Sequence, residues 1–98
     1  MVKHMIIWKM KEEIEDKAAA KAAIKAGLEG LCGKIDGLLE MKILTEGFDC
    51  SAGDLMMDST FESLAALEAY QKHPLHQETA NTLVRPNMCQ RLSFDYEV

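Results

Sequence analysis

Four short stretches of alternating side chains, separated by segments of helical spacing, constrain the fold of this chain more than any other feature of its sequence. The alternating stretches are residues 2–10, 38–46, 54–61 and 88–96. In the first of them, His4, Ile6 and Trp8 fall on one face, and Lys3 and Lys9 fall on the other. Successive side chains of a β-strand point to opposite faces, so this period of two predicts four strands.

A first helix is predicted between the first two strands. Asp16 can cap it, and we expect it to run to about Lys34. Its apolar residues recur every three or four positions and form one stripe, made of Ala20, Ile24, Leu28, Leu31 and Ile35. The opposite side, which we expect to face water, carries Lys17, Lys21, Lys25 and Glu29. Glycines near the end of this helix weaken its last turns by about 1 kcal/mol each relative to alanine.

A second helix is predicted after the third strand, with a break near its end. Ser63 can cap this helix, and Leu67 and Tyr70 lie on its core stripe. Pro74 lacks an amide hydrogen and its ring clashes with the preceding turn, so the helix ends near His73. Because proline is favoured at the first position of a helix, a new helical segment is predicted over residues 75–83.

The order β-α-β-β-α-β predicts an α+β fold of the ferredoxin-like class, with four antiparallel strands and both helices on one face of the sheet. The loop between the second and third strands predicts a hairpin. The first strand nevertheless carries apolar side chains on both faces, Met5 and Ile7 as well as Ile6 and Trp8. We therefore expect a second copy of the chain to cover the face without helices and to close a dimeric α/β barrel.

Length and charge limit the classes of function. The 98 residues suffice for one domain, which we place at residues 1–98. The formal net charge is −5, and the eleven Lys and Arg residues are dispersed among sixteen acidic residues without forming a basic stripe. Phosphate backbones would be repelled, so nucleic acid is not an expected partner.

The cysteine pattern and the hydropathy predict a cytoplasmic protein. Cys32, Cys50 and Cys89 are odd in number, widely spaced and free of any C-x-x-C pair. This pattern argues against a disulfide framework or a zinc cluster, and for a reducing compartment. No apolar stretch approaches the roughly 18 to 20 residues that span a bilayer, so we expect no contact with a membrane.

Several short motifs occur together at a characteristic spacing. They are Val2-Lys3-His4, Thr60-Phe61-Glu62-Ser63, Tyr70, His73-Pro74-Leu75-His76 and Phe94-Asp95-Tyr96. In this order the motifs resemble the stress-responsive α/β barrel family, known as the Dabb domain, over almost the whole chain. The resemblance implies a homodimeric barrel with a pocket between the sheet and the helices. It implies no particular reaction, because most members of the family have no assigned activity.

The resemblance also implies a set of candidate site residues. By similarity to a plant polyketide cyclase of this family, which needs no cofactor, Tyr70 and His76 would be catalytic, with His4 and Asp95 as neighbours. His76 would act as the base, Asp95 would orient it, and the Tyr70 hydroxyl would donate a hydrogen bond to a developing oxyanion. The first helix lacks the aromatic side chains that line the pocket of that enzyme, so we expect a different substrate.

The competing interpretation is a protein that binds a small apolar or carbonyl-containing molecule and converts nothing. In it, Tyr70 and His4 are core residues with satisfied hydrogen bonds, and His76 pins the last strand through Asp95. His73 caps or flanks the helix break. The residues expected to line the ligand pocket are His4, Ile6, Trp8 and His73.

The sequence leaves three further alternatives. The wider group of dimeric barrels includes haem-degrading and cofactor-free monooxygenases, and Trp8 with His76 would suit such a pocket. A metal site would need His4, His73 and His76 to converge, yet two of them straddle a helix start, so we assign no metal ligand and no cofactor. Free carbonyls near Cys32 and Ile35, at the end of the first helix, could hold a hard cation.

Overall fold

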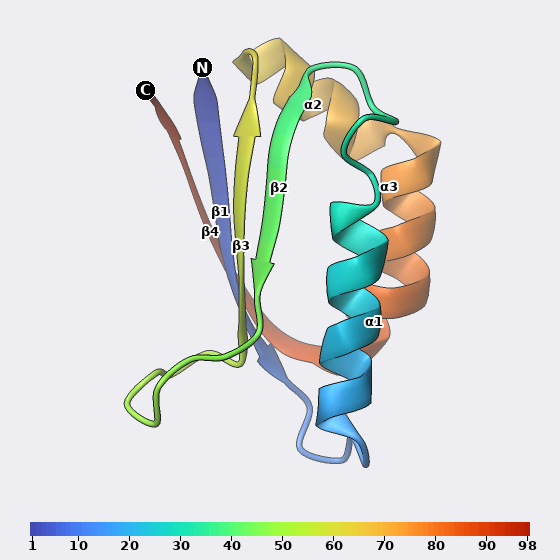
Figure 1. Ribbon diagram of the computed structural model, residues 1–98, viewed down its shortest axis with the longest axis vertical. Coiled ribbons are helices and arrows are strands. Elements are labelled where there is room, and N and C mark those ends of the chain that lie inside the picture. Colours follow the sequence, from blue (N-terminus) through green and yellow to red (C-terminus); the bar gives the residue numbers. More distant parts are fainter.

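The computed structural model describes residues 1–98 and contains one antiparallel sheet with the helices on one of its faces (Figure 1). The strands are β1 (Val2–Met10), β2 (Leu38–Leu44), β3 (Leu55–Phe61) and β4 (Met88–Glu97). They lie in the order β2-β3-β1-β4, and every neighbouring pair is antiparallel. The predicted ferredoxin-like fold is confirmed, and β2 and β3 form the predicted hairpin.

The helices are α1 (Lys17–Glu29), α2 (Leu64–Lys72) and α3 (Pro74–Thr79). A π-helical turn, Ala80–Val84, and a 3-10 turn, Arg85–Asn87, continue α3 to the start of β4. We call residues 74–87 the α3 segment. The Ser63 Oγ accepts a hydrogen bond from the Ala66 amide at 3.1 Å and caps α2. Pro74 stands at the first turn of α3, so the predicted break is confirmed.

Three elements end two or more residues earlier than predicted. Helix α1 ends at Glu29 rather than near Lys34, because glycines follow it and Gly33 adopts a left-handed φ of 89°. Strand β2 ends at Leu44, the last residue paired with β3, and the loop after it projects away from the sheet (Figure 1). The predicted helical segment changes to a π-helical turn at Ala80.

The core lies between the sheet and the helices. One face of β1 contributes Ile6 and Trp8, which are both 3% exposed, and α1 contributes Ile24 and Leu28. Tyr70 of α2 is fully buried against this cluster. The inward-facing apolar residues of the strands and the apolar stripes of the helices thus pack into a single cluster, as the spacing predicted.

Two residues on the polar side of α1 bind the backbone of β2 instead of facing only water. The Lys25 ammonium donates to the Ile43 carbonyl at 2.9 Å, and the Glu29 carboxylate accepts from the Ile43 amide at 2.9 Å. That amide and Lys25 lower the pKa of Glu29. Ile43 lies on β2, one of the two edge strands of the sheet. Lys25 and Glu29 therefore bind backbone groups that an uncovered edge would offer to another strand.

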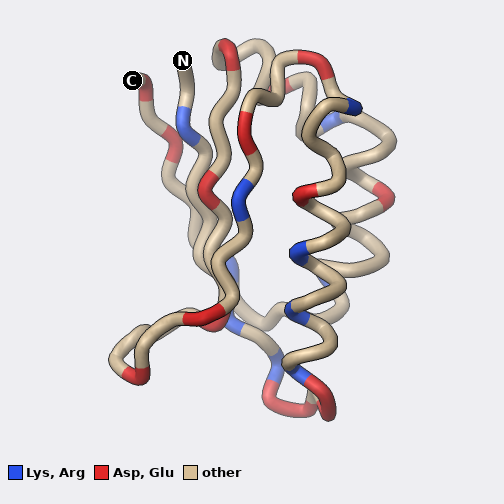
Figure 2. The backbone as a smooth tube through the Cα atoms, in the orientation of Figure 1, with Lys and Arg blue, Asp and Glu red and all other residues tan.

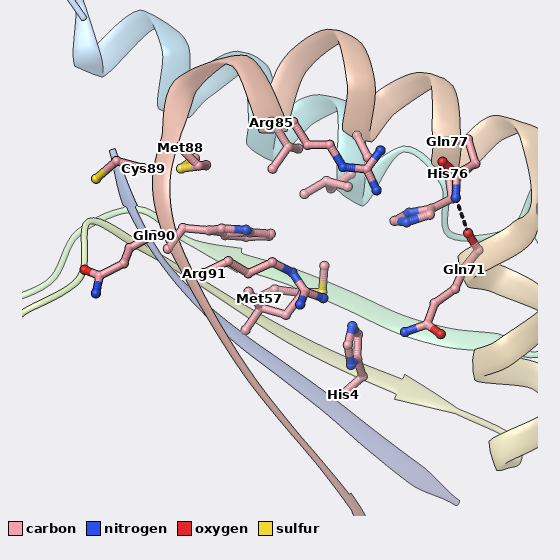
Figure 3. Close-up of a pocket in the computed structure, with 15 residues that line it drawn as sticks. His4, Met57, Gln71, His76, Gln77, Arg85, Met88, Cys89, Gln90 and Arg91 are labelled. Carbon is pink, nitrogen blue, oxygen red and sulfur yellow. Dashed lines mark hydrogen bonds between the residues drawn. The ribbon is translucent and has the colours of Figure 1, made fainter. Parts of the chain in front are cut away.

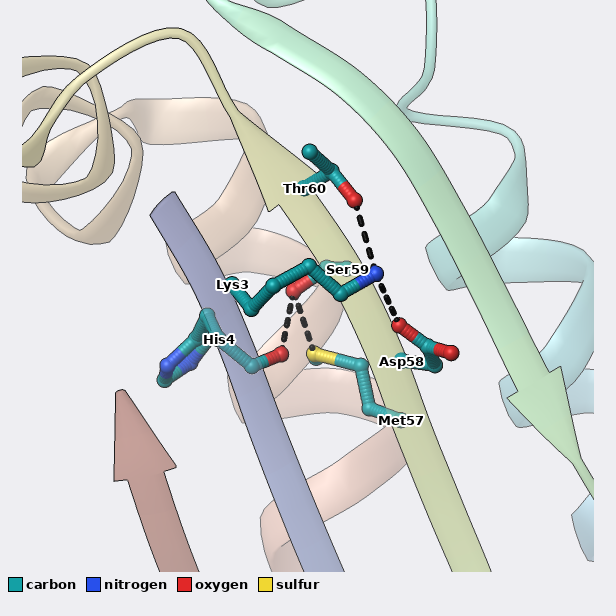
Figure 4. A network of polar contacts seen from close by, with 6 residues as sticks. All are labelled: Lys3, His4, Met57, Asp58, Ser59 and Thr60. Carbon is teal, nitrogen blue, oxygen red and sulfur yellow. Dashed lines mark hydrogen bonds and ion pairs between the residues drawn. The ribbon is translucent and has the colours of Figure 1, made fainter. Parts of the chain in front are cut away.

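The other face of the sheet has no helix over it. The register pairs Ile7 with Leu92 and Met5 with Phe94, so these four side chains share that face. Leu92 and Phe94 are each 70% exposed. Lys3 on the same face contacts the Asp58 carboxylate at 2.6 Å (Figure 4), and the hydrogen bond between them raises the pKa of Lys3. We call this surface the open face.

Candidate functional site

A cavity of about 510 Å³ lies between the sheet and the α3 segment (Figure 3). Its wall is made of His4, Ile6, Trp8, Leu28, Met57, Gln71, His76, Gln77, Ala80, Val84, Arg85, Met88, Cys89, Gln90 and Arg91. The floor comes from alternate residues of β1, the roof from α3 and its π-helical turn, and one side from the start of β4. Three of the four predicted lining residues, His4, Ile6 and Trp8, are on this wall.

His4 forms hydrogen bonds through both its side chain and its backbone. Its Nδ1 donates to the Asp95 carboxylate, which lies opposite it in the ladder between β1 and β4. Its carbonyl accepts from the Ser59 hydroxyl at 2.6 Å (Figure 4). The far end of the imidazole ring, which carries Nε2, points into the cavity (Figure 3). A carboxylate behind one ring nitrogen fixes the tautomer that leaves the other nitrogen free to accept a proton.

The expected pairing of Asp95 with His76 is therefore wrong. Asp95 lies on β4 directly across from His4, and the short strand-to-strand distance brings these two side chains together. The side chain of His4 is 3% exposed and that of Asp95 is 39% exposed. The imidazole is thus an interior group, while the carboxylate that supports it reaches water.

His76 lines the cavity from α3 on the opposite side. Its Nδ1 is buried and has no hydrogen-bond partner in the chain. Burial lowers the pKa of His76 to about 4, and the positive charges of Arg85 and Arg91 act in the same direction. At neutral pH this imidazole is uncharged and a weak proton acceptor, so it is better suited to hydrogen bonding than to the role of base.

Tyr70 lies behind the cavity wall rather than on it. Its ring is packed between Phe61 and His76, with centroid distances of 4.9 Å and 4.2 Å. The hydroxyl is buried without a hydrogen-bond partner, and burial raises its pKa. The phenol therefore keeps its proton, and its ring fixes the position of His76. Both Tyr70 and His76 hold a polar atom that no group of the chain satisfies.

His73 does not line the cavity. Its Nδ1 accepts from the Leu75 amide at 3.1 Å and caps α3, because the break at Pro74 leaves that amide without a helical partner. His4, His73 and His76 do not meet, and no group of three His, Cys, Asp or Glu side chains comes together anywhere in residues 1–98. The cation site near Cys32 stays a prediction.

Arg85, Arg91 and two glutamines also line the cavity, although the sequence analysis did not single them out. The face on which Arg91 lies could be predicted from the sequence. Arg91 stands four residues before Asp95 on the same strand, so the two side chains share one face of the sheet. Arg85 carried no such signal, since it follows an irregular turn. The glutamines are Gln71, at the end of α2, and Gln77, on α3.

The charges outside the cavity are dispersed. Lys and Arg are distributed over strands, helices and loops together with Asp and Glu, and α1 carries Lys17, Lys21 and Lys25 before Glu29 (Figure 2). The absence of a nucleic-acid partner stays a prediction. No helix has the length and apolar character needed to cross a bilayer.

Comparison with known families identifies the scaffold that carries this cavity. The family described as "Stress responsive A/B Barrel Domain" matches residues 2–98. The chain belongs to the stress-responsive α/β barrel family. The resemblance inferred from the motifs is thereby confirmed. A search of curated protein sequences finds no match.

Solved structures of other proteins share the fold of this family. A dimeric, ferredoxin-like protein of unknown function from Bacteroides fragilis is 22% identical with a TM-score of 0.90, over 99% of this chain and 95% of that one. A dimeric ferredoxin-like protein of unknown function from Jannaschia is 27% identical with a TM-score of 0.78, over 99% and 98%. A hydroxynitrile lyase from Passiflora edulis is 20% identical with a TM-score of 0.81, over 99% and 92%.

Proposed function

We propose that this stress-responsive α/β barrel protein binds a small carbonyl-containing molecule in the cavity between its sheet and its α3 segment. The observation that carries the proposal is the convergence of His4, His76 and Gln71 on a cavity with an apolar floor. Ligand sites typically enclose about 300–1,000 Å³ and combine apolar walls with a few polar groups that orient the ligand. The buried Nδ1 of His76, which lacks a partner, is one group that a ligand oxygen or a water would satisfy.

Binding can be measured through Trp8. It is the chain's single tryptophan and it lines the cavity, so its fluorescence reports on occupancy. Titration with methyl 3-oxooctanoate should give a saturable change in this fluorescence. Ala80→Phe should abolish it, because Ala80 is a buried wall residue and the larger side chain would fill the cavity.

The matched control is Ala65→Phe, on the exposed side of α2. It should leave the titration unchanged. Circular dichroism and a thermal melt would establish that both variants fold. Equal affinity in the wild type and in folded Ala80→Phe would contradict binding in this cavity, as would the lack of any saturable signal.

A second candidate function is proton transfer at a carbon next to the carbonyl, and the His4 and Asp95 pair favours it. In this reaction His4 Nε2 takes the proton, the C–H electron pair forms an enolate, and the same nitrogen returns the proton. Asp95 stabilises the imidazolium formed in between. The neutral His76 imidazole would hydrogen-bond the enolate oxygen. The hydroxynitrile lyase among the structural neighbours shows that this fold supports catalysis in another protein.

Deuterium exchange at the C2 position of methyl 3-oxooctanoate, followed by NMR, tests this second function. His4→Gln and Asp95→Asn should each lower the enzyme-dependent rate by about 10²- to 10⁴-fold, the usual contribution of a positioned acid–base group. Asp36→Asn, in the exposed turn before β2, is the matched control and should exchange as fast as the wild type. Exchange at the wild-type rate in Asp95→Asn would remove the pair from the mechanism.

We further propose that the protein is a homodimer of domains spanning residues 1–98. The apolar open face supports this, because a monomer would leave Leu92 and Phe94 largely in water. Lys3 and Asp58 on that face already form an ion pair, so neither charge would be buried without a partner. The dimeric state of structural neighbours supports the same arrangement.

A cytoplasmic location is supported by the cysteines. Cys32, Cys50 and Cys89 are all free and exposed. Exposed thiols persist in a reducing compartment and tend to be oxidised elsewhere.

A further inference from the structure

We propose that the ligand of the cavity carries a carboxylate group and that Arg85 and Arg91 hold this group at the cavity mouth. This inference rests on the proposed binding of a carbonyl compound and narrows it to small oxo acids. In such a molecule the carboxylate would lie between the two guanidinium groups, while the carbonyl would reach inward to His4 and His76.

The distribution of charge around the cavity is the first argument. The chain has only two arginines, and both are on the wall. None of its lysines is there, and no Asp or Glu is among the fifteen wall residues, although the chain as a whole carries a net charge of −5. The cavity is therefore a locally positive site in an acidic protein, and an anionic group gains from entering it.

Both guanidinium groups are free to bind an anion. Neither arginine takes part in an ion pair with Asp or Glu. Arg85 donates one hydrogen bond, to the neutral amide oxygen of Asn81, which orients the side chain without cancelling its charge. The Arg91 guanidinium forms no ion pair with any carboxylate of the chain. A guanidinium has five N–H donors, in a planar arrangement that fits the two oxygens of a carboxylate.

The fold explains why these side chains reach the same space. Arg91 lies opposite Trp8 in the ladder, so it projects from the face of β4 that looks toward the cavity. Arg85 directly follows the π-helical turn, and its amide bonds to the Ala80 carbonyl five residues earlier. This wide turn adds a residue to the helical repeat and changes the direction of the side chains that follow it. In Figure 3 the two guanidinium groups extend toward the space between His4 and His76.

The surroundings of His76 are consistent with this geometry. Burial lowers the pKa of His76, and the charges of Arg85 and Arg91 act in the same direction. A carboxylate bound between the arginines would offset these charges. The apolar floor made by Ile6, Trp8 and Met57 would hold the hydrocarbon part of the same molecule.

The test compares two ligands with the same 3-oxo chain, the anionic carboxylate 3-oxooctanoate and its neutral methyl ester, by Trp8 fluorescence at low ionic strength. The wild type should bind the carboxylate at least tenfold more tightly than the ester. Arg91→Gln and Arg85→Gln should each weaken carboxylate binding by about tenfold and should weaken ester binding by a much smaller factor, because the ester carries no charge. Lys72→Gln removes a positive charge from the exposed end of α2, outside the cavity, and should change neither affinity.

The outcomes separate this inference from the function on which it rests. If neither compound binds, the proposed function fails. If both compounds bind equally well, the proposed anion site is wrong, while binding of the ester still supports a ligand site in the cavity. The same conclusion follows if both arginine variants keep the preference of the wild type for the carboxylate. Tighter binding of 2-oxoheptylphosphonate than of 3-oxooctanoate would overturn the choice of a carboxylate in favour of a phosphonate or phosphate group.

Discussion

At the scale of single residues, two histidines on facing walls of one cavity differ in their surroundings. His4 has a carboxylate behind it, whereas His76 has buried surroundings and two arginines near it. The Asp95 carboxylate fixes the orientation and tautomer of the His4 ring, whereas burial beside positive charge disfavours the protonated form of His76. We therefore expect His4, rather than His76, to be the base in the proposed proton transfer. His76 would act as a neutral hydrogen-bonding group.

The low pKa of His76 predicts how stability depends on pH. The imidazole titrates near pH 4 in the folded chain and near its ordinary value of 6.5 when unfolded, so between these values the unfolded chain binds more protons. The free energy of unfolding should therefore fall as pH drops from 6.5 to 4. We expect His76 to account for about 1–2 kcal/mol of this loss, less than the full shift implies because its ring is partly exposed.

Urea unfolding of the wild type and of His76→Gln at pH 7 and pH 4.5 measures this contribution. Glutamine has no proton to bind in this range, so the variant lacks the His76 part of the pH dependence while its carboxyl groups still titrate. The wild type should lose stability relative to the variant as the pH is lowered. A stability difference that is the same at both pH values would show that His76 is not held in its neutral form.

At the scale of elements, irregular backbone places the site. The extended backbone at His73 ends α2, Pro74 begins α3, and the π-helical turn after α3 sets the direction of Arg85. Gly37, with a φ of 85°, enters β2 so close to α2 that a Cβ would lie 2.6 Å from the Cβ of Ala66. Only glycine fits this turn, which fixes how closely α2 packs beside the sheet.

At the scale of the whole molecule, the two faces of the sheet differ in what covers them. One face is buried by the helices and carries the cavity, while the open face exposes Ile7, Leu92 and Phe94. Its register makes these residues neighbours across β1 and β4. Figure 1 shows both chain termini at one end of these two strands. The cavity is lined by His4, Ile6 and Trp8, whose side chains lie on the opposite face of the sheet. Dimerisation through the open face would therefore leave the cavity in each copy free.

Phe94→Asp tests the homodimer. It would place a charge in the centre of the proposed apolar contact without a partner. We therefore expect the variant to sediment as a monomer at micromolar concentration in sedimentation velocity and the wild type to sediment as a dimer. Leu64→Asp is the matched control, since Leu64 is 57% exposed but lies on α2, in the helix layer. It should remain dimeric. A wild type that sediments as a monomer would contradict the homodimer itself.

The sequence by itself determined the elements and their order. The alternation in β1, the stripe on α1, the cap at Ser63 and the break at Pro74 are local patterns, because each depends on residues a few positions apart. These patterns also put His4 and Trp8 on the buried face and Asp95 on a strand. The motif resemblance added the correct family and four of the residues now found at or beside the cavity.

Which side chains form contacts with one another depends on the tertiary structure. His4 and Asp95 are separated by 91 positions, and the alternation cannot tell which residue of β4 lies opposite which residue of β1. That register follows from packing of the whole sheet against the helices, and it pairs Asp95 with His4 rather than with His76. Arg85 reaches the cavity through a π-helical turn that has no pattern in sequence. The positive cavity mouth is therefore a property of the fold, assembled from residues that are individually ordinary.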